Sequence, residues 1–127
     1  MNISIALATH NGQQYLEKQL QSLLTQTLPP DEIVVSDDGS IDGTIEILND
    51  YSNKHPQIKV IHSEHGGINN NFQNGLAACR GRFIALCDQD DVWAEDKLSH
   101  LFTAFTDTTL LTYGRSVLID SQDRRLT

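Results

Sequence analysis

Short apolar runs alternate along the chain with longer segments in which apolar residues recur every three to four positions. Four runs are typical of strands because they are short, apolar and followed by polar turns; they cover residues 3–7, 33–35, 58–61 and 83–87. The helical periodicity falls between and after them, in residues 16–24, 43–51, 68–76 and 98–105. Two further β-rich runs, Leu110–Tyr113 and Val117–Ile119, precede a polar tail and are also interpreted as strands.

This alternation predicts an α/β fold with three layers, in which a mostly parallel sheet carries helices on both faces, as in Rossmann-like proteins. The run at 83–87 is the most continuous, so we expect a strand that is buried on both faces. Right-handed crossovers place every strand-to-helix loop on the same edge of the sheet. With 127 residues and no linker or repeat, residues 1–127 are expected to form a single domain.

Composition narrows the classes of partner. Nine basic residues against 17 acidic ones give a net charge of −8, which argues against nucleic acid as a partner. No apolar run approaches the roughly 18 residues of a membrane span, and the first residues lack a signal-peptide pattern. We therefore expect a cytoplasmic protein, with peripheral attachment at the inner membrane face left open. Cys79 and Cys87 are too few for a disulfide framework and are interpreted as buried, reduced thiols.

Three polar clusters follow predicted strands and are therefore expected at one edge of the sheet, where open α/β sheets bind ligands. They are Thr9–Gly12, Asp37–Asp42 and Asp88–Asp91, and the last two hold six of the 17 acidic residues. Carboxylates gathered in this way repel one another unless a cation or hydrogen-bond donors offset their charge. A divalent metal held by oxygen ligands is the simplest solution.

The Asp88-Gln89-Asp90 sequence is the candidate metal site. In an extended chain, residues two apart point to the same side, so both carboxylates can share one cation. Mg or Mn takes one or two protein carboxylates and completes its coordination with water and substrate phosphates. The alternative is that these acids are solvated loop residues, or that Asp90 or Asp91 caps the following helix.

The turn that begins at Asp37 is the candidate ligand-binding turn. Its second acid, Asp38, is expected to accept hydrogen bonds from a ligand and to be free of other partners if Asp42 caps the next helix. The alternative is that Ser40 or Asp42 serves only as that cap. Neither a Gly-rich dinucleotide fingerprint nor a P-loop sequence is present, so the phosphates of a ligand must be held in another way.

These loop sequences together resemble the nucleotide-binding half of the family 2 glycosyltransferases, which have the GT-A fold. The matching stretches are ATHNGQQYL (8–16), LLTQTLPPDEIVVSDDGSIDGT (23–44), GGINNNFQNGLAACRGRFIALCDQDDVW (66–93) and EDKL (95–98). They keep the family's order, and the span from the first to the last covers about three-quarters of the chain. The stretch CDQDDVW is particularly similar to bacterial rhamnosyltransferases and other polysaccharide-building members.

The resemblance implies roles for individual residues around a bound nucleotide. Thr9 and Asn11 are placed in the loop beside the base, and Asp38 would accept a hydrogen bond from that base, commonly uracil or thymine. Asp88 would contact the ribose or the metal.

The same resemblance implies a metal site on the last acidic cluster. Asp90 would coordinate Mg or Mn bridging the diphosphate, with Asp91 as an adjacent ligand or orienting group. Trp93 is expected to pack beneath the loop rather than stack on a sugar.

The implied activity is inverting transfer of a sugar from a UDP- or dTDP-linked donor to a glycan or lipid-linked acceptor. Family members run well past 200 residues, so the acceptor-binding part and the general base are expected beyond residue 127. Two alternatives remain: a nucleotide-binding fragment or pseudoenzyme without transfer activity, and a sugar nucleotidyltransferase. Because apolar sheet surface would be uncovered in such a short chain, self-association into a homo-oligomer is also expected.

Overall fold

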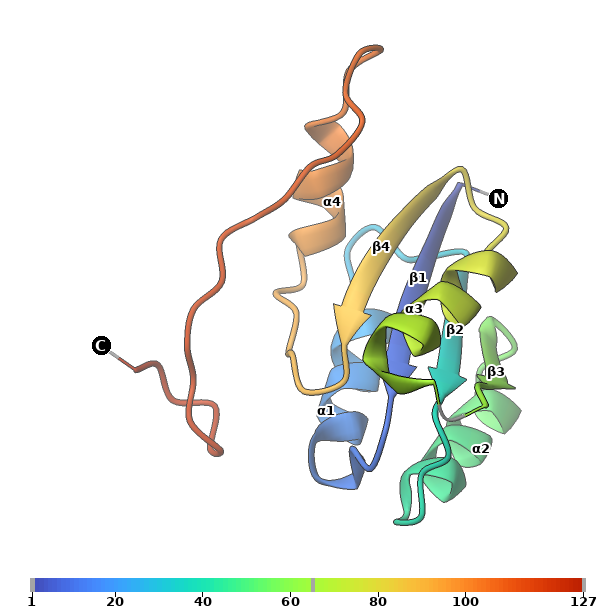
Figure 1. The fold of residues 1–127 in the computed structure, drawn as a ribbon. Coiled ribbons are helices and arrows are strands. Elements are labelled where there is room, and N and C mark those ends of the chain that lie inside the picture. Colours follow the sequence, from blue (N-terminus) through green and yellow to red (C-terminus); the bar gives the residue numbers. More distant parts are fainter. Residues whose placement is uncertain (1, 65, 127) are drawn as a thin grey trace.

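The computed structural model describes residues 2–64 and 66–126, and in these residues strands and helices alternate (Figure 1). The elements are β1 (Ile3–Thr9), α1 (Gln13–Leu24), β2 (Glu32–Asp37), α2 (Thr44–Lys54), β3 (Ile58–His62), α3 (Gly67–Ala78), β4 (Phe83–Asp88) and α4 (Lys97–Thr103). The strands form one parallel sheet in the order β3-β2-β1-β4. None of the helices in the described ranges is long and apolar enough to cross a bilayer.

Helices cover both faces of this sheet, which confirms the three-layer α/β prediction. Figure 1 shows α3 in front of β1 and β2, with α1 and α2 behind the sheet. The predicted helical stripe is buried, since Leu16, Leu20 and Leu23 have no exposed surface. They pack against alternate residues of the central strands, such as Ile5 and Ile33. Burying one such side chain contributes about 1.5–3 kcal/mol, so this layer forms the main core.

The position of β4 corrects one prediction. Its apolar run is not buried on both faces, because β4 is an edge strand and α3 packs mainly on β1 and β2. Ile84 is 42% exposed and Leu86 is 59% exposed, whereas Cys87 on the opposite face is 2% exposed. The length of an apolar run does not reveal whether a strand has neighbours on both sides, and this is why the prediction failed.

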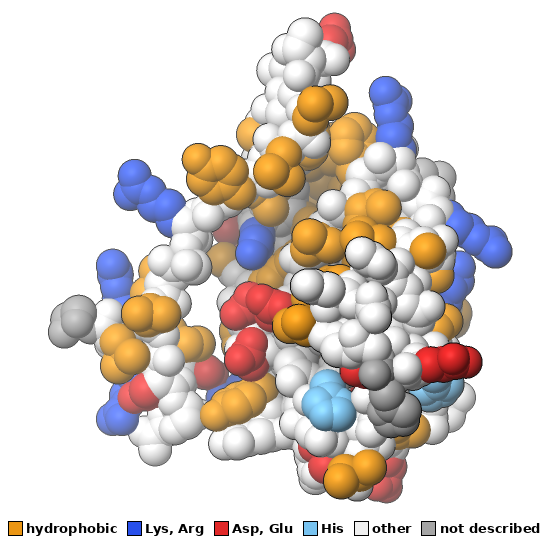
Figure 2. Space-filling model, in the orientation of Figure 1, with side chains coloured by type: hydrophobic (Ala, Val, Ile, Leu, Met, Phe, Trp, Pro, Cys, Tyr) orange, Lys and Arg blue, Asp and Glu red, His pale blue; other side chains and the backbone are white. Residues whose placement is uncertain are grey.

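The two β-rich runs after α4 correct another prediction. Leu110–Tyr113 and Val117–Ile119 form no strand, and the only pairing among the described residues there is an isolated bridge between Ile119 and Arg125. Figure 2 shows orange hydrophobic side chains along this C-terminal segment. β-propensity needs a partner strand to become a strand, and these runs have none in the structure.

A buried carboxylate ties the sheet together at the amino end of β2. Glu32 is 1% exposed. It accepts hydrogen bonds from the Ser4 hydroxyl (2.6 Å), the Arg80 backbone N–H and the Lys59 ammonium (3.0 Å). Gly81 then passes so close to Ser4 that a Cβ would come within 2.6 Å of its backbone nitrogen. β1, β3 and the turn before β4 are therefore fixed through one side chain.

Candidate functional site

Three loops meet at the carboxyl edge of the sheet, as expected for parallel strands (Figure 1). The loop after β1 lies between the other two and is hydrogen-bonded to both. The Asn11 backbone N–H donates to Ser40 Oγ (2.8 Å), and Asn11 Oδ1 accepts from the Ile41 N–H (2.9 Å). On the other side, Gln89 accepts from the His10 N–H (2.7 Å) and donates to the His10 carbonyl (3.0 Å). The three predicted clusters thus form one connected surface.

A buried acid holds the loop after β2 against β1. Asp37 accepts hydrogen bonds from the Thr9 hydroxyl (2.7 Å), the Ser40 hydroxyl (2.6 Å) and the Ser40 backbone N–H (2.8 Å). Thr9 and Asp37 are both at most 1% exposed. The Thr9 side chain therefore supports the loop from inside, whereas Asn11 lies on its exposed side with a left-handed φ of 48°.

Asp38 has partners of its own, which corrects the prediction that it is free. Its two carboxylate oxygens accept from the backbone N–H groups of Gly66 and Gly67, each at 3.2 Å, where α3 begins. The positive end of the helix favours this charge. Gly67 has φ +80°, which glycine adopts readily. A carboxylate has about four acceptor positions, so Asp38 retains capacity for a ligand donor.

Asp42 lies one residue before Gly43, the N-cap position of α2, and it satisfies a backbone N–H of the first turn, whereas Ser40 does not. Asp42 accepts from the Thr44 N–H (3.0 Å) and also from the Gln13 N–H (3.2 Å) at the start of α1. Hydrogen bonding by Thr44 lowers the pKa of the exposed Asp42 carboxyl. Asp42 therefore joins the two helix starts and stays charged.

The acids after β4 are brought together on the same edge of the sheet. Asp88, Asp90 and Asp91 are all exposed, and the Asp91 N–H closes a tight turn onto the Asp88 carbonyl (3.3 Å). Partial burial and the charges of Asp88 and Asp90 raise the pKa of Asp91, while Lys97 opposes the shift. Within the described residues no three His, Cys, Asp or Glu side chains surround a metal position. The arrangement is an open group of oxygen donors.

The base of this acidic turn is anchored from α1 by a residue that the sequence did not indicate. Gln19 has no exposed surface and donates to the Asp88 carbonyl and to Cys87 Sγ. Its position inside the apolar stripe of α1 is the only signal that could have found it. Trp93, 5% exposed, packs in the core as expected, and burial raises the pKa of the Cys87 thiol.

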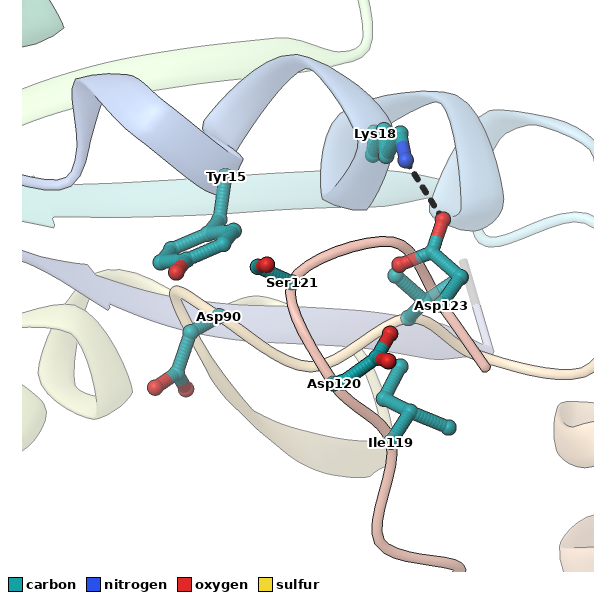
Figure 3. A pocket seen from close by; sticks show the side chains of 8 residues that line it. Tyr15, Lys18, Asp90, Ile119, Asp120, Ser121 and Asp123 are labelled. Carbon is teal, nitrogen blue, oxygen red and sulfur yellow. Dashed lines mark hydrogen bonds and ion pairs between the residues drawn. The ribbon is translucent and has the colours of Figure 1, made fainter. Parts of the chain in front are cut away.

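Two cavities open beside Asp90. The first, of about 190 Å³, lies between α1 and residues 119–123. Figure 3 shows Tyr15 and Asp90 on one side of it and Asp120 on the other, with the ion pair of Lys18 and Asp123 at its end. The second, of about 410 Å³, is lined by Asp90 and Asp91 and by the cationic side chains of Lys97 and Arg115. Sequence reasoning missed these cationic groups because they come from separate segments.

Comparison with known families gives one match over nearly all of the chain. The family model described as Glycosyl transferase family 2 matches residues 4–126. An uncharacterized glycosyltransferase of Bacillus subtilis, EpsJ, is 32% identical over 97% of this chain and 36% of its own length. TuaG of the same organism, named a putative teichuronic acid biosynthesis glycosyltransferase, is 34% identical over 76% of this chain and 38% of its own. The chain thus spans little more than a third of these relatives.

Solved structures show the same architecture. TarS of S. aureus, crystallised with UDP-GlcNAc, is 31% identical over 81% of this chain and 30% of its own, with a TM-score of 0.73. Glucosyl-3-phosphoglycerate synthase of Mycobacterium tuberculosis, in complex with Mn²⁺ and UDP, is 28% identical over 69% of this chain and 33% of its own, with a TM-score of 0.56. The GT-A fold expected from the loop sequences is thereby confirmed.

Proposed function

The chain belongs to glycosyl transferase family 2, and on that premise we propose that residues 1–127 are the donor-binding part of an inverting glycosyltransferase. The part takes a nucleoside-diphosphate sugar, with UDP or dTDP as the nucleotide. The acceptor-binding part and the general base lie outside these residues, which is supported by the short share of each relative that the chain spans.

The observation that carries this proposal is the joining of three loops at one sheet edge by hydrogen bonds. The uracil or thymine base of the nucleotide lies near Asn11 and Asp38. The acceptor positions that remain on Asp38 suit the N–H of this base. Thr9 acts from below, through Asp37, by holding the loop in place. Asp88 lies at the end of β4, two strands from Asp38, and contacts the ribose or the metal.

The donor set after β4 fits Mg or Mn. Partial burial first, and then the negative charges of Asp88 and Asp90, raise the pKa of Asp91, and Lys97 opposes this shift without reversing it. Hard divalent cations prefer carboxylate oxygens, and one or two of them suffice when phosphates complete the coordination. We assign Asp90 and Asp88 as ligands and Asp91 as an adjacent ligand or orienting group. When bound, the cation would stabilise the charge that develops on the leaving diphosphate.

Transfer then requires an acceptor hydroxyl on the opposite side of the anomeric carbon from the diphosphate. The hydroxyl oxygen forms the new bond as the bond to the diphosphate breaks, its proton passes to a general base, and the configuration inverts. The acceptor we propose is a glycan, free or lipid-linked, and a glycan is supported by TuaG, whose name places it in teichuronic acid biosynthesis. A lipid-linked acceptor would bring the protein to the inner face of the membrane.

Calorimetry of nucleotide binding tests this proposal. UDP and dTDP are titrated into the chain with Mn²⁺ and again with chelator, and GDP serves as a base control. We expect UDP or dTDP to bind only with metal, and Asp90→Asn to abolish this binding. Asp107→Asn, with the same charge change in the loop after α4, is the matched control and keeps wild-type affinity.

The outcomes separate the proposal from its alternatives. Binding that is unchanged in Asp90→Asn would remove Asp90 from the site. Tight metal-dependent binding of a nucleoside triphosphate together with a sugar phosphate would favour the nucleotidyltransferase. Donor binding without transfer, in a longer chain that includes the acceptor-binding part, would favour the pseudoenzyme.

A further inference from the structure

The acidic turn after β4 and the loop after β1 leave the sheet side by side and then lose the support of its backbone hydrogen bonds. β1 and β4 pair as far as Ala8 and Asp88, and beyond that point the two segments lead to different helices. Among the residues that the structure describes, only two hydrogen bonds join residues 10–12 to residues 89–91, and Gln89 makes both. One side chain therefore holds the two segments together.

Gln89 binds both backbone groups of a single residue. Its Oε1 accepts from the His10 N–H (2.7 Å), and its Nε2 donates to the His10 carbonyl (3.0 Å). A carboxamide suits this arrangement because it carries an acceptor and a donor side by side, whereas a carboxylate has no donor. Gly12 lies against the same group, since a Cβ added there would come 2.8 Å from Gln89 Cδ. The lack of a side chain at Gly12 therefore leaves room for these two bonds.

His10 in turn contacts the loop after β2. Its ring Nδ1 lies 2.9 Å from the Asp38 carbonyl oxygen, and because a carbonyl only accepts, Nδ1 carries the proton and donates. The next residue, Asn11, is hydrogen-bonded to the same loop. A continuous series of contacts thus leads from the acidic turn, through Gln89 and His10, to Asn11 and Asp38, the two residues that the proposed function places beside the base.

We propose that Gln89 is a positioning residue that couples the metal end of the nucleotide site to its base end. A nucleoside that orders the loop after β1 also orders the acidic turn, because Gln89 holds both. Ordering the two segments costs conformational entropy, and the ligand that binds first removes part of that cost for the second. Metal and nucleoside then tighten each other's binding by the same factor. This inference rests on the proposed function and adds the coupling of its two halves.

Binding of Mn²⁺ with and without a nucleoside tests the coupling. Uridine and thymidine carry no phosphate, so neither can reach the metal in the way that a nucleoside diphosphate does. Electron paramagnetic resonance measures free Mn²⁺ while the metal is titrated into the chain, first alone and then with saturating nucleoside. In the wild type we expect the nucleoside to lower the Kd of Mn²⁺ about fivefold or more, as coupled sites typically do.

Two substitutions break the contact from opposite sides. Gln89→Leu removes both hydrogen bonds and keeps most of the side-chain bulk. Gly12→Ala retains Gln89 but displaces its carboxamide from His10, and the fold tolerates this because only the end of a flexible side chain must move. Each should reduce the effect of the nucleoside on the Kd of Mn²⁺ to less than about twofold.

Gly43→Ala is the matched control. Gly43 is the N-cap residue of α2, as Gly12 is of α1, and its added Cβ would also meet the end of a glutamine side chain, 2.8 Å from Gln13 Cδ. Gln13 contacts the loop after β2 and not the acidic turn. This variant should therefore keep the wild-type effect of the nucleoside.

Hydrogen exchange supplies a second readout that needs no metal. The Asp91 N–H closes the acidic turn onto the Asp88 carbonyl. The nucleoside alone should slow exchange of this amide in the wild type and in Gly43→Ala, but not in Gln89→Leu or Gly12→Ala. If Gln89 only stabilised the fold, its loss would change the overall stability and leave this nucleoside-dependent difference in place.

The outcomes separate this inference from the proposed function. If Mn²⁺ and a nucleoside both bind the wild type but do so independently, the inference is overturned and the proposed function stands. Coupling that persists in Gln89→Leu and Gly12→Ala, or that is lost equally in Gly43→Ala, would also overturn it. If neither ligand binds the wild type, the proposed function fails and the inference fails with it. Where circular dichroism shows that one of the two variants is unfolded, the other decides.

Discussion

Replacing Glu32 by Gln should remove a pH-dependent part of the stability of the sheet. Burial by itself would raise the pKa of this carboxyl, but hydrogen bonds from Ser4, Arg80 and Lys59 outweigh it and lower the pKa from 4.5 to about 2. One pKa unit corresponds to 1.36 kcal/mol, so the charged form contributes about 3 kcal/mol to the folded state. Because the pKa is depressed on folding, this contribution is complete above about pH 4.5 and is lost as the pH falls towards about 2.

Glu32→Gln keeps the shape of the side chain but places an amide, which carries no charge, beside the Lys59 ammonium. We expect the free energy of unfolding at pH 7 to fall by about 1.5–3 kcal/mol, the range for hydrogen bonds to charged groups. The difference between wild type and variant should shrink steadily below pH 4.5, because the wild type then loses its charge. Urea unfolding followed by circular dichroism, repeated down the pH series, measures both effects.

Asp50→Asn is the matched control, since Asp50 forms an exposed ion pair with Lys54 (3.0 Å) on α2. Such surface pairs contribute about 0–1 kcal/mol, so this variant should unfold almost as the wild type does. The reasoning would be refuted if Glu32→Gln were no less stable than Asp50→Asn. It would be refuted equally if the wild type and Glu32→Gln lost stability with the same slope below pH 4.5.

Three further outcomes follow from the geometry. Asp90→Asn should lower the pKa of Asp91, because the substitution removes a neighbouring negative charge that raises this pKa. A carbon-13 NMR titration of the side-chain carboxyls measures the shift, and an unchanged midpoint for Asp91 would contradict the prediction. Gly81→Ala should destabilise the fold by about 1–3 kcal/mol, because the added Cβ would come 2.6 Å from the backbone nitrogen of Ser4 in β1. A melting curve that matches the wild type would disprove this close approach. Cys87, 2% exposed, should react with a thiol reagent much more slowly than the half-buried Cys79, and equal rates in native protein would show that the strand opens readily.

The alternation of elements and the meeting of three loops at one edge were predictable because both follow from local patterns. The spacing of Leu16, Leu20 and Leu23 identifies a buried helical face, and parallel strands bring their carboxyl ends together. The position of β4 was not predictable, because an apolar run indicates a strand but does not indicate whether that strand lies in the centre or at the edge of the sheet. The exposed Leu86 is the result.

Within the site, the sequence predicted which residues gather at the sheet edge, but it did not predict which of them are buried or what each one contacts. Two adjacent acids look equivalent in sequence, yet they have different contacts. Asp37 is fully buried, whereas Asp38 accepts hydrogen bonds from the backbone at the start of α3. The difference arises from strand alternation and from the arrival of α3, which is far along the chain. Gln19 was missed for the same reason, since its partner at Asp88 lies 69 residues away.

The buried bonds among Thr9, Asp37 and Ser40 have a consequence for how this protein can change over evolutionary time. They hold the loop from inside, since Thr9 and Asp37 have almost no exposed surface. An exposed side chain of this loop that makes no hydrogen bond, such as Ile41, can therefore be exchanged without loosening the frame that carries it. If the proposed function holds, a lineage can move from one nucleotide to another by small steps on that outer surface, while selection for a stable fold acts on a separate set of residues below it.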